Sequence, residues 1–427
     1  MADRLAALSA RVAELERLAS SPDASADTHW VITCGIMIFL MQVGFTMLEA
    51  GSVRIKNTMN ILLKNLMDSC LGALFWFLIG EAILKSGTGA FIDIDPYYVA
   101  MSGYNASSLA FVEEKKPDPL ALWWFEFAFA ANAATIVSGA MAERTQILAY
   151  IVYSSLVSGF IYPVVARWVW NPHGWLSVAN ERAFSGGVID YAGSLVVHVS
   201  GGFIALWGAA IVGPRRGRFD AAGQPVTMPG HNASLRVLGT FFLWIGWYGF
   251  NSGSSLSIST PTAARECARV VVTTTLSAAA GGLSVCALDK ALGSRTYSVS
   301  APTHPILPIC HTPFSLYITG IYLEGVLFSH SSDSSHMPHA ILPMYHHVRV
   351  CFSYFKVSAV CNGILSGLVS VTAGCAAFEL RVAPLVGCIG GAVYMIIARV
   401  SAREIRVREK AVGRRKAVER PNDERPN

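Results

Sequence analysis

Long apolar runs separated by short polar loops make up most of the chain. Nine of these runs can span a bilayer, which takes roughly 20 mostly apolar residues in a helix. They lie at residues 30–50, 60–84, 120–141, 147–169, 190–213, 235–255, 268–288, 360–377 and 383–398. The runs show no alternating strand pattern, and a helix satisfies its own backbone polar groups inside the membrane. The pattern therefore predicts an all-α polytopic membrane protein.

Composition agrees with this class. Of the 427 residues, 53% are hydrophobic and 14% are charged, which is too apolar for a soluble globule. The net charge of +5 comes from short loops and a basic tail, so it reflects topology and predicts no nucleic-acid partner. Nine cysteines are scattered without a CxxC pair, and we interpret them as packing residues. We expect no metal and no cofactor.

The loops alternate in charge. Basic residues at 54–56, 144 and 215–218 fall on one side of the membrane, and acidic residues at 93–95 and 113–114 fall on the other. Cytoplasmic loops carry the excess of Lys and Arg. The sequence therefore predicts an N-terminus outside and a cytoplasmic C-terminus, in what we expect to be the plasma membrane.

Three segments lie outside the two groups of spans, which occupy residues 30–295 (spans 1–7) and 359–400 (spans 8–9). Residues 1–29 carry apolar residues at 3-4-3 spacing, which indicates an extracellular amphipathic helix that pairs with its copies or lies alone. Residues 296–358 hold seven of the eleven histidines and repeated prolines, so we interpret them as an atypical insert that makes no net crossing. Residues 401–427 form the basic tail.

The run 190–213 carries two ionisable residues. It opens with Asp190 and places His198 in mid-span, where an ionisable group costs several kcal/mol unless it lines a pathway or has a partner. His198 is therefore a candidate functional residue. The alternative is a packing histidine that is bonded to a neighbouring helix carbonyl. If the run is helical, the two residues are about two turns, or ~12 Å, apart and cannot touch.

Five motifs carry a resemblance to a known family. They are MQVGFTMLEAGSVRIKNTMNILLKN (41–65), FAFAANAATIVSGAMAER (127–144), DYAGSLVVH (190–198), IGWYGFNSGSS (245–255) and CNGILSGLVSVTAGC (361–375). In this order they resemble the ammonium transporter family of the plant, algal and protist type. The resemblance implies two inverted halves of five helices around a pore, assembled as a homotrimer in membrane lipid, with ammonium or ammonia as substrate.

The resemblance also implies the site residues. Phe129 and Phe250 match the family's stacked pore gate, and His198 matches its pore histidine. Trp170, Ser254, Phe129 and Asp190 match the exterior substrate site. The residue types suit this role, because a small cation is attracted to aromatic faces and a hydroxyl oxygen accepts an N–H. Asp190 is expected to act by stabilising local backbone and by adding negative potential.

One departure from the family keeps alternatives open. The family pairs its pore histidine with a second one in an HGxxG-type motif on a later span, and no such motif follows Ala398. We therefore expect about nine of the family's eleven spans. A non-conducting regulatory subunit or ammonium sensor of the same fold is one alternative to a transporter. A membrane enzyme that uses His198 with Asp190 is another, but base and orienter should lie within about 3 Å, so we do not expect an enzyme.

Overall fold

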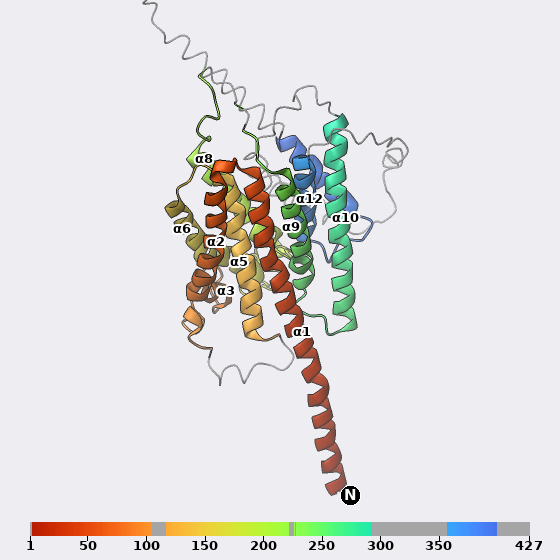
Figure 1. Cartoon of the computed structure of the whole chain (residues 1–427). Coiled ribbons are helices and arrows are strands. Elements are labelled where there is room, and N and C mark those ends of the chain that lie inside the picture. Colours follow the sequence, from red (N-terminus) through yellow and green to blue (C-terminus); the bar gives the residue numbers. More distant parts are fainter. Residues whose placement is uncertain (1, 105–116, 222–225, 227, 292–356, 399–427) are drawn as a thin grey trace, which may run out of the picture.

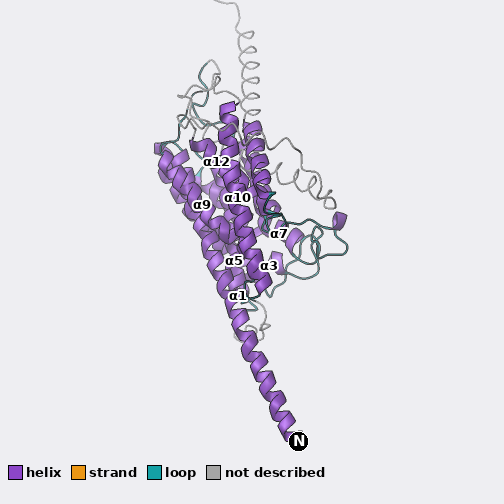
Figure 2. Ribbon diagram, turned by 90° about the vertical axis from the view of Figure 1, so that its right-hand side faces the viewer, coloured by secondary structure: helices purple, strands orange, loops and turns teal. Residues whose placement is uncertain are grey.

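The computed structural model describes residues 2–104, 117–221, 226, 228–291 and 357–398. Within these ranges the regular structure is helical, apart from one isolated bridge between Ser177 and Val188 (Figure 2). The predicted all-α class is confirmed. The insert, except for its last two residues, and the basic tail 401–427 lie outside the described residues.

The helices form an elongated bundle (Figure 1). The α-helices are α1 (Ala2–Ser52), α2 (Thr58–Phe75), α3 (Glu81–Lys85), α5 (Pro119–Met141), α6 (Ile147–Leu156), α7 (Tyr162–Trp170), α8 (Ser200–Val212), α9 (Ala233–Gly253), α10 (Pro261–Ala291) and α12 (Val357–Thr372). Short 3-10 turns are η1 (Ile55–Asn57), η3 (Val99–Met101) and η5 (Phe184–Gly186). A further helix covers Ala383–Ala398.

Three helices contain or begin with π-helical segments. η2 (Trp76–Gly80) joins α2 to α3, η4 (Val157–Ile161) joins α6 to α7, and η6 (Ser194–Val199) leads into α8. Each composite helix is long enough to span. Among the described residues, six stretches are sufficiently long and apolar to cross a membrane: Ala24–Ser52, Ile55–Lys85, Pro119–Met141, Ile147–Trp170, Ser194–Val212 and Pro261–Ala291. The remaining three predicted runs correspond to α9, α12 and Ala383–Ala398.

The first helix organises the bundle. α1 is continuous from Ala2 through the first span, and its N-terminal part projects beyond the other helices (Figures 1 and 2). Its second half packs along α9 on one side and α5 on another. α1 and α9 approach closely at Gly44, where an added Cβ would lie 2.8 Å from the backbone nitrogen of Leu243. Small residues at such a crossing let two backbones approach.

Three ionisable side chains are buried where α1 meets α2. The Nζ atom of Lys64 lies 3.0 Å from an oxygen of Asp68 and 3.6 Å from an oxygen of Glu49. The Ser138 hydroxyl, on α5, donates to the other oxygen of Glu49. All three ionisable side chains are at most 3% exposed. Removing one partner from such a buried pair costs about 3–5 kcal/mol, so this cluster ties three helices together.

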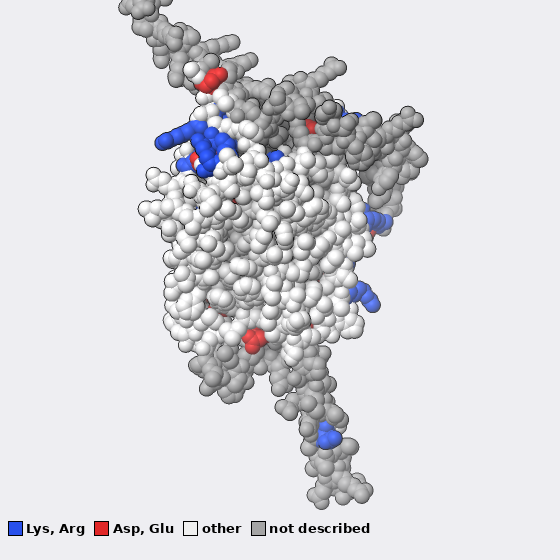
Figure 3. All heavy atoms as spheres, in the orientation of Figure 1, with Lys and Arg blue, Asp and Glu red and all other residues white. Residues whose placement is uncertain are grey.

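The basic loops meet at one end of the bundle, which we call the basic end. The Glu143 carboxylate, after α5, accepts from the backbone and side chain of Arg54 and pairs with Arg215 beyond α8. Figure 3 shows Lys and Arg gathered at this end and few charges on the middle of the visible face. The three loops that the charge pattern placed on one side therefore lie together.

Candidate functional site

Two phenylalanines from different helices stack in the middle of the bundle. Phe129 on α5 and Phe250 on α9 have ring centroids 4.1 Å apart and planes inclined by 30°. They are 1% and 0% exposed. Phe125, one turn before Phe129, adds a tilted contact at 4.9 Å. The structure thus brings together the two residues that the resemblance identifies as a gate, although they lie 121 positions apart in the sequence.

His198 lies next to this pair. Its ring is stacked on Trp247 at 5.0 Å with an angle of 14°, and it is 5.4 Å from the ring of Phe250. Its Nε2 atom is buried and has no hydrogen-bond partner among the described residues. A buried polar atom without a partner is costly, so the environment of Nε2 favours the functional interpretation, in which a ligand or a proton completes it.

Trp170 completes the row at the end of α7. Its ring meets Phe129 edge to face at 5.9 Å, and its indole N–H donates to the backbone carbonyl of Asp190 at 2.7 Å. Trp170 is half-buried, whereas the residues that follow it in the row are buried. The rings of Trp170, Phe129, Phe250, His198 and Trp247 form a continuous aromatic row, which we call the aromatic column.

Ser254 lies one turn beyond Phe250, at the C-terminus of α9. Its hydroxyl donates to the carbonyl of Phe250 at 2.8 Å, which leaves its oxygen lone pairs as acceptors. It is half-buried. Its contact with the site is this bond to Phe250, and its lone pairs could accept an N–H from a cation that reaches it.

Asp190 holds the start of η6. One carboxylate oxygen accepts from the backbone N–H groups of Gly193 and Ser194 at 3.0 and 2.7 Å. The other accepts from Leu195 and Val196, both at 2.9 Å. These are the donors that a helix N-terminus leaves without partners. Asp190 is therefore engaged with backbone amides, as the sequence led us to expect, and its backbone carbonyl accepts from the Trp170 indole.

The expected helical spacing between Asp190 and His198 is wrong. The helix begins at Ser194, and Gly193 before it adopts a left-handed conformation with φ of 98° that glycine tolerates best. The chain folds back at Gly193, so that the Asp190 carboxylate can reach the amides. The rise of an α-helix therefore does not describe the path from Asp190 to His198.

Trp247 of the aromatic column and Phe125, which contacts the column at Phe129, were not identified from the sequence. Trp247 precedes Phe250 by three residues and Phe125 precedes Phe129 by four, so each lies on the same helix face as its partner. That spacing was the available signal. Trp247 is also fixed in place, because its indole N–H donates to the hydroxyl of Thr372 on α12 at 2.9 Å.

The fold and this row of rings define a class: a polytopic helical membrane protein with an aromatic column that leads to a buried histidine. The sequence profile of the Ammonium Transporter Family matches residues 29–300 and 344–411. The chain belongs to this family. Its membership confirms the resemblance that the five motifs carried.

Individual relatives agree. The chain is 41% identical over 279 residues to the ammonium transporter Amt2 of Archaeoglobus fulgidus, covering 64% of this chain and 56% of the relative. It is 35% identical over 371 residues to ammonium transporter 1 member 3 of Solanum lycopersicum, covering 85% of this chain and 65% of the relative. The chain thus spans less than two thirds of the length of these curated relatives.

Solved structures share the fold. The Saccharomyces cerevisiae Mep2 crystal structure superposes with a TM-score of 0.59 at 23% identity, covering 86% of this chain and 66% of Mep2. A structure titled Sensor Amt Protein gives a TM-score of 0.57 at 23% identity and covers 92% of this chain and 94% of its own. At these identities the likeness concerns the fold alone.

Proposed function

We propose that this protein is an ammonium transporter or channel in which ammonium is recruited at Trp170 and passes along the aromatic column to His198. The observation that carries the proposal is the column itself, because edge and face contacts connect Trp170, Phe129, Phe250 and His198 without a gap. The names of the relatives supply the substrate, ammonium. Desolvated cations gain on the order of 2 kcal/mol over an aromatic face.

Each residue has a distinct role in this proposal. Trp170 and Ser254 bind the cation at the mouth, with Phe129 beneath it, and Asp190 supports both the backbone and the negative potential there. Phe129 and Phe250 form the gate, which has to separate for passage because their rings are in contact. His198 offers its unpartnered Nε2 to ammonia or to a proton inside the protein.

We further propose a homotrimer in the plasma membrane, with the N-terminus outside and the C-terminus in the cytoplasm. The basic end, where Arg54, Arg144 and Arg215 lie, would face the cytoplasm under the positive-inside rule. The Trp170 end would then face outward, which suits a site that recruits ammonium from the medium.

A non-conducting sensor is the second candidate. The family pairs its pore histidine with a second one, whereas among the histidines in the described ranges His198 is the one that contacts the column. This difference supports a protein that binds ammonium without conducting it. A membrane enzyme is not proposed. Both oxygens of Asp190 are bonded to backbone amides, and the ring neighbours of His198 are Trp247 and Phe250, so Asp190 does not orient His198 as a catalytic base.

The experiment is growth of a yeast strain that lacks its own ammonium transporters on limiting ammonium. The full chain should restore growth, and its surface level should be confirmed by labelling. Absence of growth at normal surface level, together with retained binding of methylammonium to the purified protein, would favour the sensor. Absence of both growth on ammonium and methylammonium binding would contradict the proposed function.

A further inference from the structure

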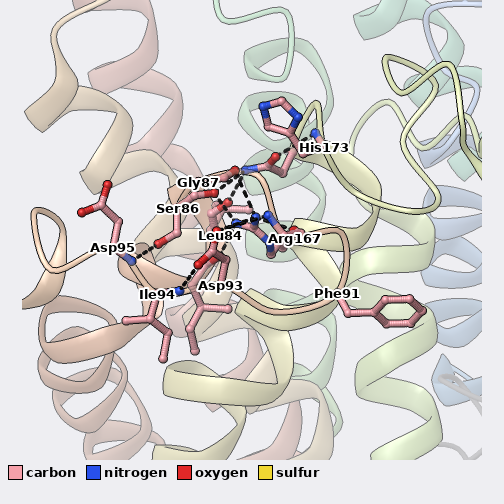
Figure 4. A network of polar contacts seen from close by, with 12 residues as sticks. Leu84, Ser86, Gly87, Phe91, Asp93, Ile94, Asp95, Arg167 and His173 are labelled. Atoms are coloured by element: carbon pink, nitrogen blue, oxygen red, sulfur yellow. Dashed lines mark hydrogen bonds and ion pairs between the residues drawn. The ribbon is translucent and has the colours of Figure 1, made fainter.

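A buried arginine lies one turn before Trp170. Arg167 on α7 is 0% exposed, and its guanidinium faces a stretch of backbone that follows α3 (Figure 4). It donates at 2.5–3.2 Å to the carbonyl oxygens of Ile83, Ser86, Gly87 and Gly89. Asp93 lies 3.8 Å from its Nη2 atom. We call residues 83–93 the docking segment.

Two neighbours of Arg167 bind the same segment. The Trp168 indole N–H donates to the carbonyl of Phe91 at 2.9 Å, and the Asn171 amide donates to the carbonyl of Leu84 at 2.8 Å. The last turn of α7 therefore holds the docking segment through three side chains. Trp170 belongs to that same turn, but its own indole bonds elsewhere, to Asp190.

The chemistry explains why an arginine is suited to this position. The last carbonyls of α3 have no helical partner, and the C-terminal end of a helix favours a positive charge. The planar guanidinium presents five donors in a fixed fork and can satisfy several carbonyls at once, whereas a lysine is a point charge. Within the segment, a Cβ at Gly87 would lie 2.3 Å from a carboxylate oxygen of Asp93, so a larger residue there would require the Asp93 side chain to move.

The position of Trp170 depends on this turn. α7 has only nine residues and follows the π-helical η4, so its end is not the continuation of a long regular helix. In this one turn Arg167 bonds to the docking segment, while Trp170 contacts Asp190 and Phe129. A shift of the turn would displace the indole from its edge contact with Phe129.

We propose that Arg167 is a positioning residue for cation recruitment: by fastening the docking segment to the last turn of α7, it holds the Trp170 indole at the mouth of the aromatic column. This inference rests on the proposed function, in which Trp170 binds the cation. Arg167 itself does not touch the substrate, because its guanidinium is buried and committed to carbonyls.

The test uses the purified full chain and equilibrium binding of radiolabelled methylammonium. Arg167→Gln should weaken binding by up to about tenfold, the contribution expected of Trp170 itself. Arg167→Lys should weaken it less. The matched control is Arg182→Gln, which removes the same charge from an exposed position in the loop after α7 and should leave binding unchanged. Equal binding by Arg167→Gln and the unaltered protein would overturn the proposal.

A double substitution distinguishes positioning from a general structural effect. If Arg167 acts through Trp170, Arg167→Gln should cause no further loss when Trp170→Leu is already present, because the two changes remove one interaction. Additive losses would contradict the proposal. Should Arg167→Gln fail to fold, Asn171→Ala is used in its place: it removes the amide bonds to the Leu84 and Ser86 carbonyls and the acceptor of the His173 backbone N–H, and leaves the Arg167 bonds intact. The same comparison with Trp170→Leu is then made.

A second readout does not depend on ammonium. The fluorescence emission of Trp170 is obtained by subtracting the spectrum of a Trp170→Leu variant from that of the same protein with Trp170 present. The wavelength of this difference emission should shift when Arg167→Gln or Asn171→Ala is also present in both proteins. An unshifted difference spectrum would overturn the positioning role. If the unaltered protein binds no methylammonium, the proposed function fails, and the emission comparison still decides whether Arg167 positions the indole.

Discussion

Replacing Asp190 by asparagine should destabilise the protein. The carboxylate accepts four backbone N–H groups at 2.7–3.0 Å, and an asparagine replaces one of its oxygens by a donor. Two of the four amides then lose their acceptor. Hydrogen bonds to charged groups contribute about 1.5–3 kcal/mol each, so the loss amounts to roughly 3–6 kcal/mol. The start of η6, which leads to His198, should loosen first.

The assay is the thermal unfolding midpoint of the purified protein in detergent. Asp190→Asn should lower it by several degrees. Asp118→Asn is the matched control, because Asp118 caps α5 through a single bond to the Leu120 amide and asparagine is an equally good cap. If Asp190 acted only by attracting cations, Asp190→Asn would keep the midpoint and weaken binding alone. An unchanged midpoint would refute the reasoning.

Three further predictions follow from the buried and aromatic contacts. Trp170→Leu should weaken methylammonium binding roughly tenfold. The control Trp207→Leu, at a position 57% exposed on α8, should leave binding unchanged. Equal methylammonium affinities of the two variants would remove Trp170 from the site. Lys64→Met leaves two buried carboxylates without a cation and should lower the free energy of unfolding by about 3–5 kcal/mol. Its thermal unfolding midpoint should therefore lie below that of the control Lys290→Met, which changes an exposed lysine. Identical midpoints for the two variants would contradict a stabilising role of the buried cluster. Deleting residues 296–356, the part of the insert that precedes α12, should leave membrane insertion and oligomer size unchanged, and loss of either would make the insert a structural element.

Hydropathy was sufficient to predict the helices. A bilayer requires long apolar stretches, and each predicted run corresponds to a helix, with α5 starting at Pro119 behind the cap of Asp118 as such signals predict. The local break at Gly193 was missed, since an apolar run reads as one helix and a positive φ leaves no trace in hydropathy. The π-helical segments were missed for the same reason.

His198 and Asp190 stood out in the sequence as ionisable residues in an apolar run, and the family motifs supplied the other predicted site residues. Spacing within one helix could have identified Trp247, because it shares a face with Phe250. Its stacking on His198 depends on the rotation of α9 against η6, which non-local packing decides. Arg167 resembles an ordinary basic residue near a helix end in the sequence. Its role emerges only when the chain after α3 is seen folded over it.

The most direct test of the central claim is uptake of radiolabelled methylammonium by vesicles that contain the purified full chain. The account predicts saturable uptake that ammonium competes away and that His198→Ala lowers, because the aromatic column delivers its cargo to this imidazole. Vesicles that contain folded protein able to bind methylammonium, yet take up no more than protein-free vesicles, would contradict it.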